Sequence, residues 1–238
     1  MNNSFVNTAR LLGAGLRALL VLTLVTGVLY PLVVTGIAQG LFGDKANGSE
    51  IKADGKVVGS SLIGQSYDLP LKKGRQTPEP DLKWFQGRPA NGLGGNSLNT
   101  RYKLILSGAT NLAADSGAVN GSCPAKPDDG TLCAQVLAAK AAVVKDNSVP
   151  GYPVTPSQVP ADAVTSSGSG LDPAISPAYA ELQVHRVAAK NGLSVTQVEK
   201  LVKDHTQARS LGFIGEPRVS VLQLNIALRE LTAKRGRS

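Results

Sequence analysis

The longest uninterrupted apolar segment of the 238-residue chain runs from Ala18 to Phe42. It contains no charged residue and lies between Arg17 and Asp44. At about 1.5 Å per residue, a helix of this length crosses a hydrocarbon core of roughly 30 Å. A helix is the form that a single segment takes in lipid, because it satisfies its own backbone hydrogen bonds. The pattern therefore predicts one transmembrane helix over residues 18–42.

The charges beside this segment predict its orientation. Arg10 and Arg17 precede it, and the first acidic residue of the chain is Asp44. Basic residues near the first span remain on the cytoplasmic side, whereas a long following domain is translocated largely regardless of its charge. Residues 1–17 are therefore predicted to be a cytoplasmic N-terminus, and residues 43–238 one extracytoplasmic soluble domain.

A cleaved secretory signal is the alternative for the same segment. Gly36-Ile37-Ala38 offers small residues at the spacing that a signal peptidase reads, and cleavage after Ala38 would release a secreted binding domain. The apolar run is longer than the roughly 7–15 residues of a typical signal core, however, and it continues through Phe42. Its length favours a retained anchor.

Beyond the span, the pattern of apolar and polar positions changes repeatedly between strand and helix periods and predicts a mixed α+β domain. A Pro-rich loop over residues 69–83 and a stiff linker over residues 150–160 separate the predicted elements. These elements are, in chain order, a hairpin or short strands within 51–67, a helix over 132–145, a helix from Pro177 to a stop at Gly192, a helix from Val195 to about Arg209, and a strand at Val219 that becomes helical at about Asn225–Leu231.

Two of the predicted helices have clear start signals. Ser176-Pro177 provides an N-cap followed by proline at the first helical position, and Ser194 with Gln197 forms a capping box. Each helix also has an apolar face, so we expect the two to pack as a hairpin. The residues on these faces are Tyr179, Leu182, Val187 and Ala188 on the first helix, and Val195, Val198, Leu201, Val202 and His205 on the second.

The formal net charge of +8 changes this picture little. The lysines and arginines are scattered and form no basic helix face with interleaved aromatics, which argues against nucleic acid as a partner. Attraction to anionic lipid head groups or to an acidic partner is the simpler interpretation. Cys123 and Cys133 are the only cysteines, and an isolated pair outside the cytoplasm predicts a structural disulfide rather than a metal site.

Candidate catalytic chemistry is sparse. The sequence has no Gly-rich phosphate-binding motif and no carboxylate cluster with metal-ligand spacing, so neither a cofactor nor a metal is expected to bind directly. A membrane-tethered hydrolase using Ser169 with His185 or His205 is the enzyme alternative. A nucleophile elbow needs glycine two residues before its serine, but residue 167 is Ser.

The predicted span itself restricts function. Because it has no ionisable residue, one such helix cannot line an ion path or relay protons alone. Gly36 and Gly40 form a Gly-x-x-x-Gly pattern, which favours close approach of another helix. The residues themselves therefore predict a membrane-anchored outer domain without a recognisable catalytic centre, and if transport is involved, other chains must supply the pore.

Several blocks, in order along nearly the whole chain, carry a resemblance to a known family. They include Phe85-Gln86-Gly87-Arg88-Pro89, Ser107–Leu112, Val164–Pro173, Gln183-Val184-His185-Arg186-Val187-Ala188, and Gly215–Val219 leading to Leu222–Leu228. In these blocks the chain resembles the C subunits of bacterial Kdp potassium-transporting ATPases. Residues 69–83 have the character of an insertion, and the cysteine pair is not a general feature of the family.

The resemblance implies an accessory, non-pore subunit of a high-affinity, ATP-driven potassium uptake complex in the bacterial cell membrane. Its implied partners are a channel-like potassium-binding subunit and a P-type ATPase subunit, which handle potassium and ATP. The implied role is to assist assembly and to act as a chaperone that increases ATP use by the P-type subunit. The family is also described as nucleotide-binding, and the resemblance makes Gln183 the candidate residue.

Overall fold

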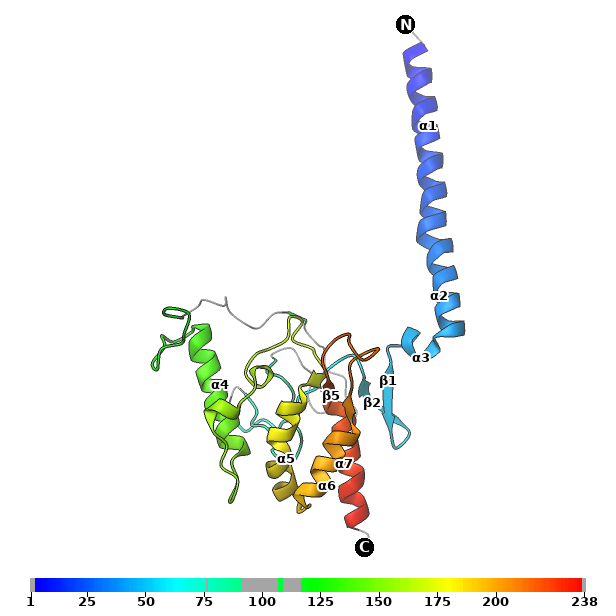
Figure 1. Ribbon diagram of the computed structural model, residues 1–238. Helices are drawn as coiled ribbons and strands as arrows, with labels where there is room; N and C mark the ends of the chain where they lie inside the picture. Colours follow the sequence, from blue (N-terminus) through cyan, green and yellow to red (C-terminus); the bar gives the residue numbers. More distant parts are fainter. Residues whose placement is uncertain (1–2, 76, 91–106, 109–116, 237–238) are drawn as a thin grey trace. The chain divides into compact units, whose positions relative to one another are not determined.

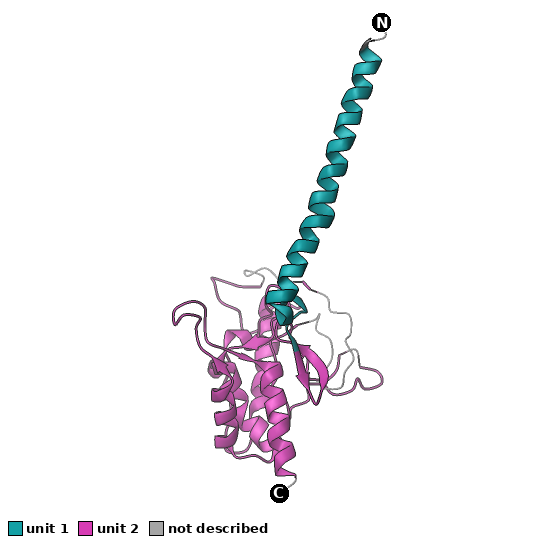
Figure 2. Cartoon of the chain, turned by 90° about the vertical axis from the view of Figure 1, so that its right-hand side faces the viewer, with its two compact units in different colours: residues 1–50 teal, residues 51–238 magenta. Residues whose placement is uncertain are grey.

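The computed structural model describes residues 3–75, 77–90, 107–108 and 117–236, so most of the block Ser107–Leu112 lies outside it. The chain forms two compact units, residues 1–50 and residues 51–238, which are coloured separately in Figure 2. We call the second unit the head.

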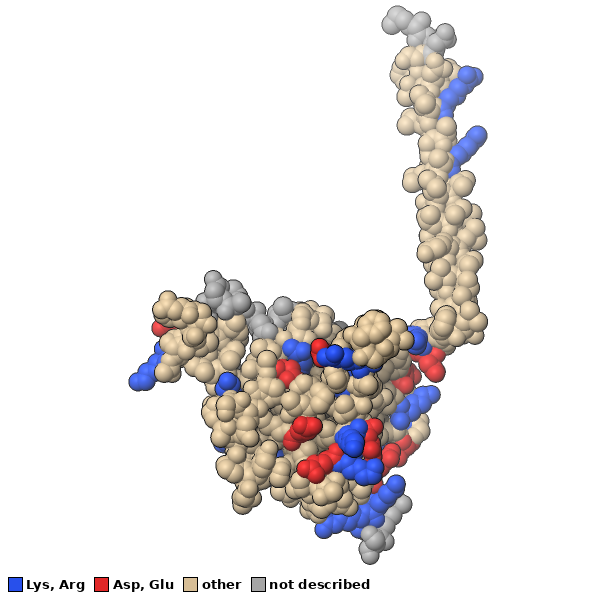
Figure 3. Space-filling model, in the orientation of Figure 1, with Lys and Arg blue, Asp and Glu red and all other residues tan. Residues whose placement is uncertain are grey.

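The first unit is a long apolar helix followed by one short turn of helix. Ser4–Leu41 is the one described helix that is long and apolar enough to cross a membrane, with a mean hydropathy of 2.2 over an 18-residue stretch, as the sequence predicts. Figure 3 shows basic side chains near its start and no charged side chain farther along it. The unit comprises α1 (Asn3–Leu24), a π-helical turn η1 (Val25–Leu29), α2 (Tyr30–Leu41) and α3 (Gly43–Ala46).

The π-helical turn has an identifiable cause in the sequence. Pro31 has no N–H group, so it cannot donate to the carbonyl of Gly27 as an α-helix requires. Immediately before it, the Tyr30 N–H donates to the carbonyl of Val25, five residues back, which is the π-helical spacing. The helix therefore continues through the proline with a local change of hydrogen-bond register.

The head combines helices with two small antiparallel sheets, which confirms the predicted α+β class (Figure 1). β1 pairs with β2, and the three short strands of the other sheet lie in the order β3-β5-β4. Its elements are β1 (Glu50–Ala53), β2 (Lys56–Ser60), α4 (Leu132–Asn147), the 3-10 turns η3 (Pro156–Gln158) and η4 (Ala161–Ala163), β3 (Ala174–Ile175), α5 (Pro177–Asn191), α6 (Val195–Asp204), β4 (Thr206–Gln207), β5 (Arg218–Ser220) and α7 (Val221–Arg235).

The hairpin or short strands predicted within residues 51–67 are present as the hairpin of β1 and β2. Its two turn residues, Asp54 and Gly55, both have positive φ angles, 50° and 74°. Asp-Gly in this conformation forms the tight turn whose twist matches that of antiparallel strands. Arg229 on α7 forms an ion pair with Asp54 at 2.8 Å, which connects this turn to the C-terminal helix.

The predicted pair α5 and α6 packs as a hairpin. Ser176 accepts a hydrogen bond from the N–H of Tyr179, Gly192 ends α5 in the left-handed conformation, and Ser194 with Gln197 forms the capping box. α6 ends at Asp204 rather than near Arg209, however. The next residues form β4, in which Thr206 pairs with Val219 and Gln207 with Arg218, and strand pairing there is incompatible with a longer helix.

Two other predictions needed correction. The C-terminal helix begins at Val221 rather than near Asn225, directly after the three residues of β5. The segment 150–160 is not a free linker, because Val154 and Val159 are buried in the main hydrophobic core. Local proline content predicted an extended chain there, but the contacts that bury it come from distant parts of the sequence.

Candidate functional site

The segment from Leu82 to Arg88 is held by side chains that come from two helices distant in the sequence. We call the three residues that hold it, Gln183, Arg186 and Asn225, the polar clamp. Gln183 and Asn225 have no exposed surface, and Arg186 is 1% exposed. Burial of three polar side chains is unfavourable unless their donors and acceptors are paired. The hydrogen-bond partners of each side chain therefore indicate its role in the head.

Gln183 on α5 pairs with both backbone polar groups of Gln86. Its Oε1 accepts from the Gln86 N–H at 2.7 Å, and its Nε2 donates to the Gln86 carbonyl at 3.1 Å. Oε1 also accepts from Nη2 of Arg186 at 2.6 Å. The side-chain amide therefore acts like a neighbouring strand toward one residue of the segment, and its polar atoms are both occupied within the head.

Asn225 on α7 pairs in the same way with both backbone polar groups of Phe85, the residue before Gln86. Its Oδ1 accepts from the Phe85 N–H and its Nδ2 donates to the Phe85 carbonyl, both at 2.9 Å. Phe85 itself is fully buried in the core. Two side-chain amides thus satisfy four backbone groups on consecutive residues, in a segment that has no strand partner for them.

Arg186 completes the clamp with donors to four acceptors. It donates to Oδ1 of Asn147 at 2.9 Å, to the carbonyls of Leu82 and Trp84, and to Gln183. Burial lowers the pKa of its guanidinium to about 10, while nearby Tyr179 and Asp146 oppose that shift. Arg186 therefore joins α4, α5 and the clamped segment through a charge that is buried and hydrogen-bonded.

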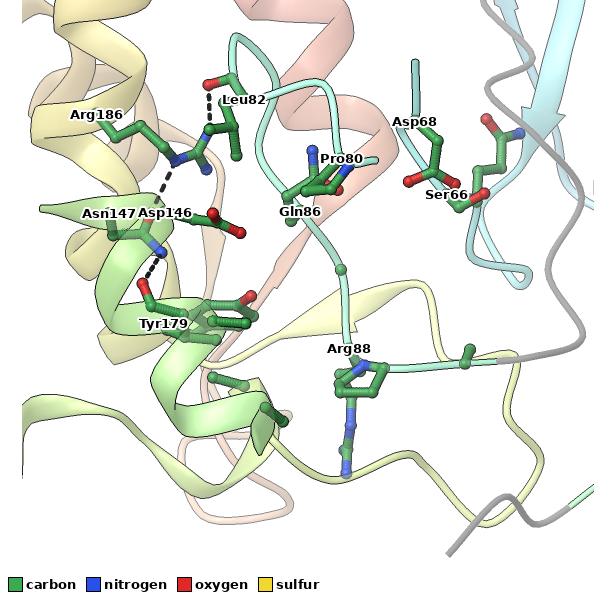
Figure 4. A pocket seen from close by; sticks show the side chains of 18 residues that line it. Ser66, Asp68, Pro80, Leu82, Gln86, Arg88, Asp146, Asn147, Tyr179 and Arg186 are labelled. Atoms are coloured by element: carbon green, nitrogen blue, oxygen red, sulfur yellow. Dashed lines mark hydrogen bonds between the residues drawn. The ribbon is translucent and has the colours of Figure 1, made fainter. Parts of the chain in front are cut away.

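A cavity of about 320 Å³ lies beside the clamp (Figure 4). Burial raises the pKa of Asp68, and a hydrogen bond from Ser66 opposes that shift. Burial likewise raises the pKa of Asp146, which the charge of Arg186 opposes. The described part of the chain contains no group of three His, Cys, Asp or Glu side chains that could hold a metal ion.

Arg88 lies at the other side of this cavity, and its contacts are directed into the head. It donates to the carbonyls of Thr165 and Ser166 at 3.3 and 3.1 Å, and forms an ion pair with Asp172 at 3.5 Å. Both arginines beside the cavity, Arg88 and Arg186, are thus occupied with internal partners. This arrangement stabilises the folded head and presents no paired nucleophile and base among the described residues.

The residues of the hydrolase alternative are not brought together. Ser169 Oγ lies 3.4 Å from Ser167 Oγ and accepts from the N–H of Leu171. His185 stacks on Tyr152 with ring centroids 3.6 Å apart, and Nδ1 of His205 contacts the carbonyl of Leu201. Among the described contacts, neither histidine is a partner of Ser169.

The remaining predicted residues have clear positions. Cys123 and Cys133 form a disulfide at the start of α4. Apart from the adjacent residues and the backbone of α2 itself, Gly36 and Gly40 have no atom within 4 Å of where a side chain would begin, so this side of α2 is open to a neighbour.

Sequence reasoning did not single out Arg186 or Asn225. Gln183 and Arg186 are three residues apart on the face of α5 that also carries Tyr179 and Leu182. Two long polar side chains on an otherwise apolar helix face indicate buried pairing. That pattern was the available signal for Arg186, whereas Asn225 lies 140 residues from its partner Phe85.

Comparison with known proteins decides the family. The family model described as "K+-transporting ATPase, c chain", KdpC, matches residues 12–230. The chain belongs to the KdpC family. It is 72% identical over 233 residues to a potassium-transporting ATPase KdpC subunit of Streptomyces coelicolor, a match that covers 98% of each chain.

Other KdpC relatives extend this comparison. A potassium-transporting ATPase KdpC subunit of Streptomyces avermitilis is 71% identical, over 98% of this chain and 99% of the relative. One of Mycobacterium bovis is 42% identical, over 91% of this chain and 96% of the relative. As a KdpC chain, the protein is a subunit of a potassium transport complex, and the polar clamp lies entirely within the region that the family model matches.

Proposed function

We propose that this KdpC chain is a noncatalytic, non-pore subunit that assists assembly of the potassium-transporting complex and increases ATP use by its P-type ATPase subunit. The observation that carries the proposal is the combination of one apolar span with a head whose clamp residues are engaged internally. A single span without ionisable residues cannot provide an ion path alone. The transport path and the ATP-hydrolysing site then belong to other subunits.

We place the N-terminus in the cytoplasm and the head outside it. Arg10 and Arg17 precede the apolar segment, in agreement with the retention of basic residues on the cytoplasmic side. The disulfide between Cys123 and Cys133 supports the same orientation, because such bonds persist in oxidising compartments outside the cytoplasm.

In this orientation the head packs on the outer face of the channel-like potassium-binding subunit, near potassium entry. The span contributes a second contact through Gly36 and Gly40, whose open side lets another helix approach closely. The head then acts on the complex through contact with its partners.

Gln183, which the family resemblance links to nucleotide binding, has a structural role in this proposal. Both polar atoms of its amide are hydrogen-bonded to Gln86, and the residue has no exposed surface. A nucleotide could reach it only after the clamp had opened. ATP use is therefore raised through the P-type subunit rather than by a nucleotide held at Gln183.

Purification of the complex with and without this chain tests the proposal. The chain is expected to copurify in mild detergent with two large membrane proteins, and its deletion is expected to lower potassium-stimulated ATPase activity several-fold. Re-expression of the full chain should restore activity, whereas the span alone, residues 1–50, should not. Recovery of a fully active pump without the chain would disprove the proposal.

A further inference from the structure

The turn between β4 and β5 exposes three large apolar side chains within four residues. Leu211, Phe213 and Ile214 are 83%, 73% and 52% exposed, respectively. Single exposed apolar residues are common on protein surfaces, but a cluster of this kind marks a surface that another phase or molecule covers. We call residues 210–214 the apolar tip.

The backbone of the apolar tip is organised by its own hydrogen bonds. Ser210 and Ile214 exchange two hydrogen bonds, each 2.9 Å long, and the N–H of Gly212 donates to the carbonyl of Arg209. Leu211 has a φ angle of 54°, a left-handed conformation that a leucine rarely adopts. The hairpin therefore holds these side chains outward instead of letting them fold back onto the head.

Basic residues flank the tip on both arms of the hairpin. Arg209 forms an ion pair with Glu216 at 2.8 Å and remains about half exposed, and Arg218 is exposed on β5. An apolar end with arginines behind it matches the boundary between acyl chains and phosphate head groups, because arginine keeps its charge at the phosphates while apolar groups enter the acyl region.

The segment between α2 and β1 is short, which limits how far the start of β1 can lie from the end of the span. Eight residues, 42–49, separate the end of α2 from the start of β1. Eight residues span at most about 28 Å even when fully extended. Within the head, the start of β1 and the turn next to β5 lie at the same end (Figure 1).

We infer that the apolar tip inserts into the lipid interface and gives the head a second attachment to the membrane. The occupant is the bilayer surface, with Leu211, Phe213 and Ile214 at the acyl boundary and Arg209 and Arg218 at the phosphates. The inference concerns lipid contact of this chain alone and does not rest on the proposed role in the complex.

Tryptophan quenching by brominated lipids tests the insertion. The full chain carrying Phe213→Trp is placed in vesicles of phosphatidylethanolamine and phosphatidylglycerol with brominated acyl chains. The matched control is Thr196→Trp, an exposed residue at the start of α6, the end of that helix remote from β4. The wild-type chain supplies the signal of Trp84, the only native tryptophan.

After subtraction of the Trp84 signal, we expect the added fluorescence of Phe213→Trp to be quenched at least about threefold more strongly than that of Thr196→Trp. Equal quenching of the two variants would overturn the inference. Shielding of the introduced indole of Phe213→Trp from aqueous acrylamide only in the assembled complex, without quenching by brominated lipid, would overturn it as well, since another protein would then cover the tip.

Discussion

Gln183 and Asn225, on α5 and α7, each pair with both backbone polar groups of one residue, and the two residues that they hold are neighbours, Gln86 and Phe85. The two amides approach a single segment from separate helices. The segment therefore connects α5 directly to α7, although α6, β4 and β5 lie between these helices in the sequence. The polar clamp is therefore a set of internal contacts that links two helices of the head through this segment.

Replacement of Gln183 by leucine tests this role. The change leaves the N–H and carbonyl of Gln86 and one donor of Arg186 without partners, and each unpaired buried group costs about 1–3 kcal/mol. We expect Gln183→Leu to lower the free energy of unfolding by about 3–5 kcal/mol in urea titrations. The control Gln135→Leu changes an exposed glutamine on α4 and is expected to stay within about 0.5 kcal/mol of wild type. Unchanged stability of Gln183→Leu together with lost ATP binding would favour the nucleotide role instead.

The raised pKa of Asp68 predicts a pH-dependent effect of its neutral analogue. A carboxyl group with a raised folded-state pKa contributes stability that is present when it is protonated and is lost as pH rises through that pKa. Asp68→Asn should therefore be more stable than wild type at pH 7, and the difference should vanish in acid. Thermal unfolding at several pH values measures this effect.

Asp204 provides the matched control for Asp68, because its shift has the opposite sign. A hydrogen bond from Lys200 lowers the pKa of Asp204, so its charged form is favoured in the folded chain. Asp204→Asn should not stabilise the protein at pH 7. If both variants behaved alike across the pH range, the interpretation of Asp68 would be wrong.

The disulfide between Cys123 and Cys133 should stabilise the start of α4. It closes a loop with a sequence separation of 10, and chain entropy gives such a loop about 2–3 kcal/mol. We expect the double replacement by serine, or addition of a reductant, to lower the melting temperature. Reductant should have no further effect on the double variant, and an unchanged melting temperature of the reduced wild type would contradict the prediction.

The glycines of the span should matter for assembly and not for the fold of the head. Gly36→Leu with Gly40→Leu fills the open side of α2 and is expected to reduce copurification of the other subunits at least about fivefold. Val34→Leu, on the opposite face of the same exposed helix, is the control for added bulk. Full recovery of the complex with both leucines would exclude this contact.

Local signals predicted much of the fold. The apolar run ending at Phe42, the caps of α5 and α6, and the strand pattern within 51–67 all act within a few residues, so sequence patterns reveal them. The end of α6 was not predictable in the same way, because it depends on pairing of Thr206 with Val219. The polar clamp is even harder to predict from the sequence. Its contacts join residues 97 and 140 positions apart, and a glutamine that pairs with a distant backbone has no local pattern.

The orientation of the head is the central claim, and protease accessibility measures it most directly. Protease is added to protoplasts, which are cells that have lost the wall but keep an unbroken membrane. Fragments are detected with a tag at the N-terminus. The account predicts that the head is digested while the tagged span stays protected, and that a cytoplasmic marker protein survives in the same sample. A head that resists protease until the membrane is opened, under conditions that digest it afterwards, would contradict the account.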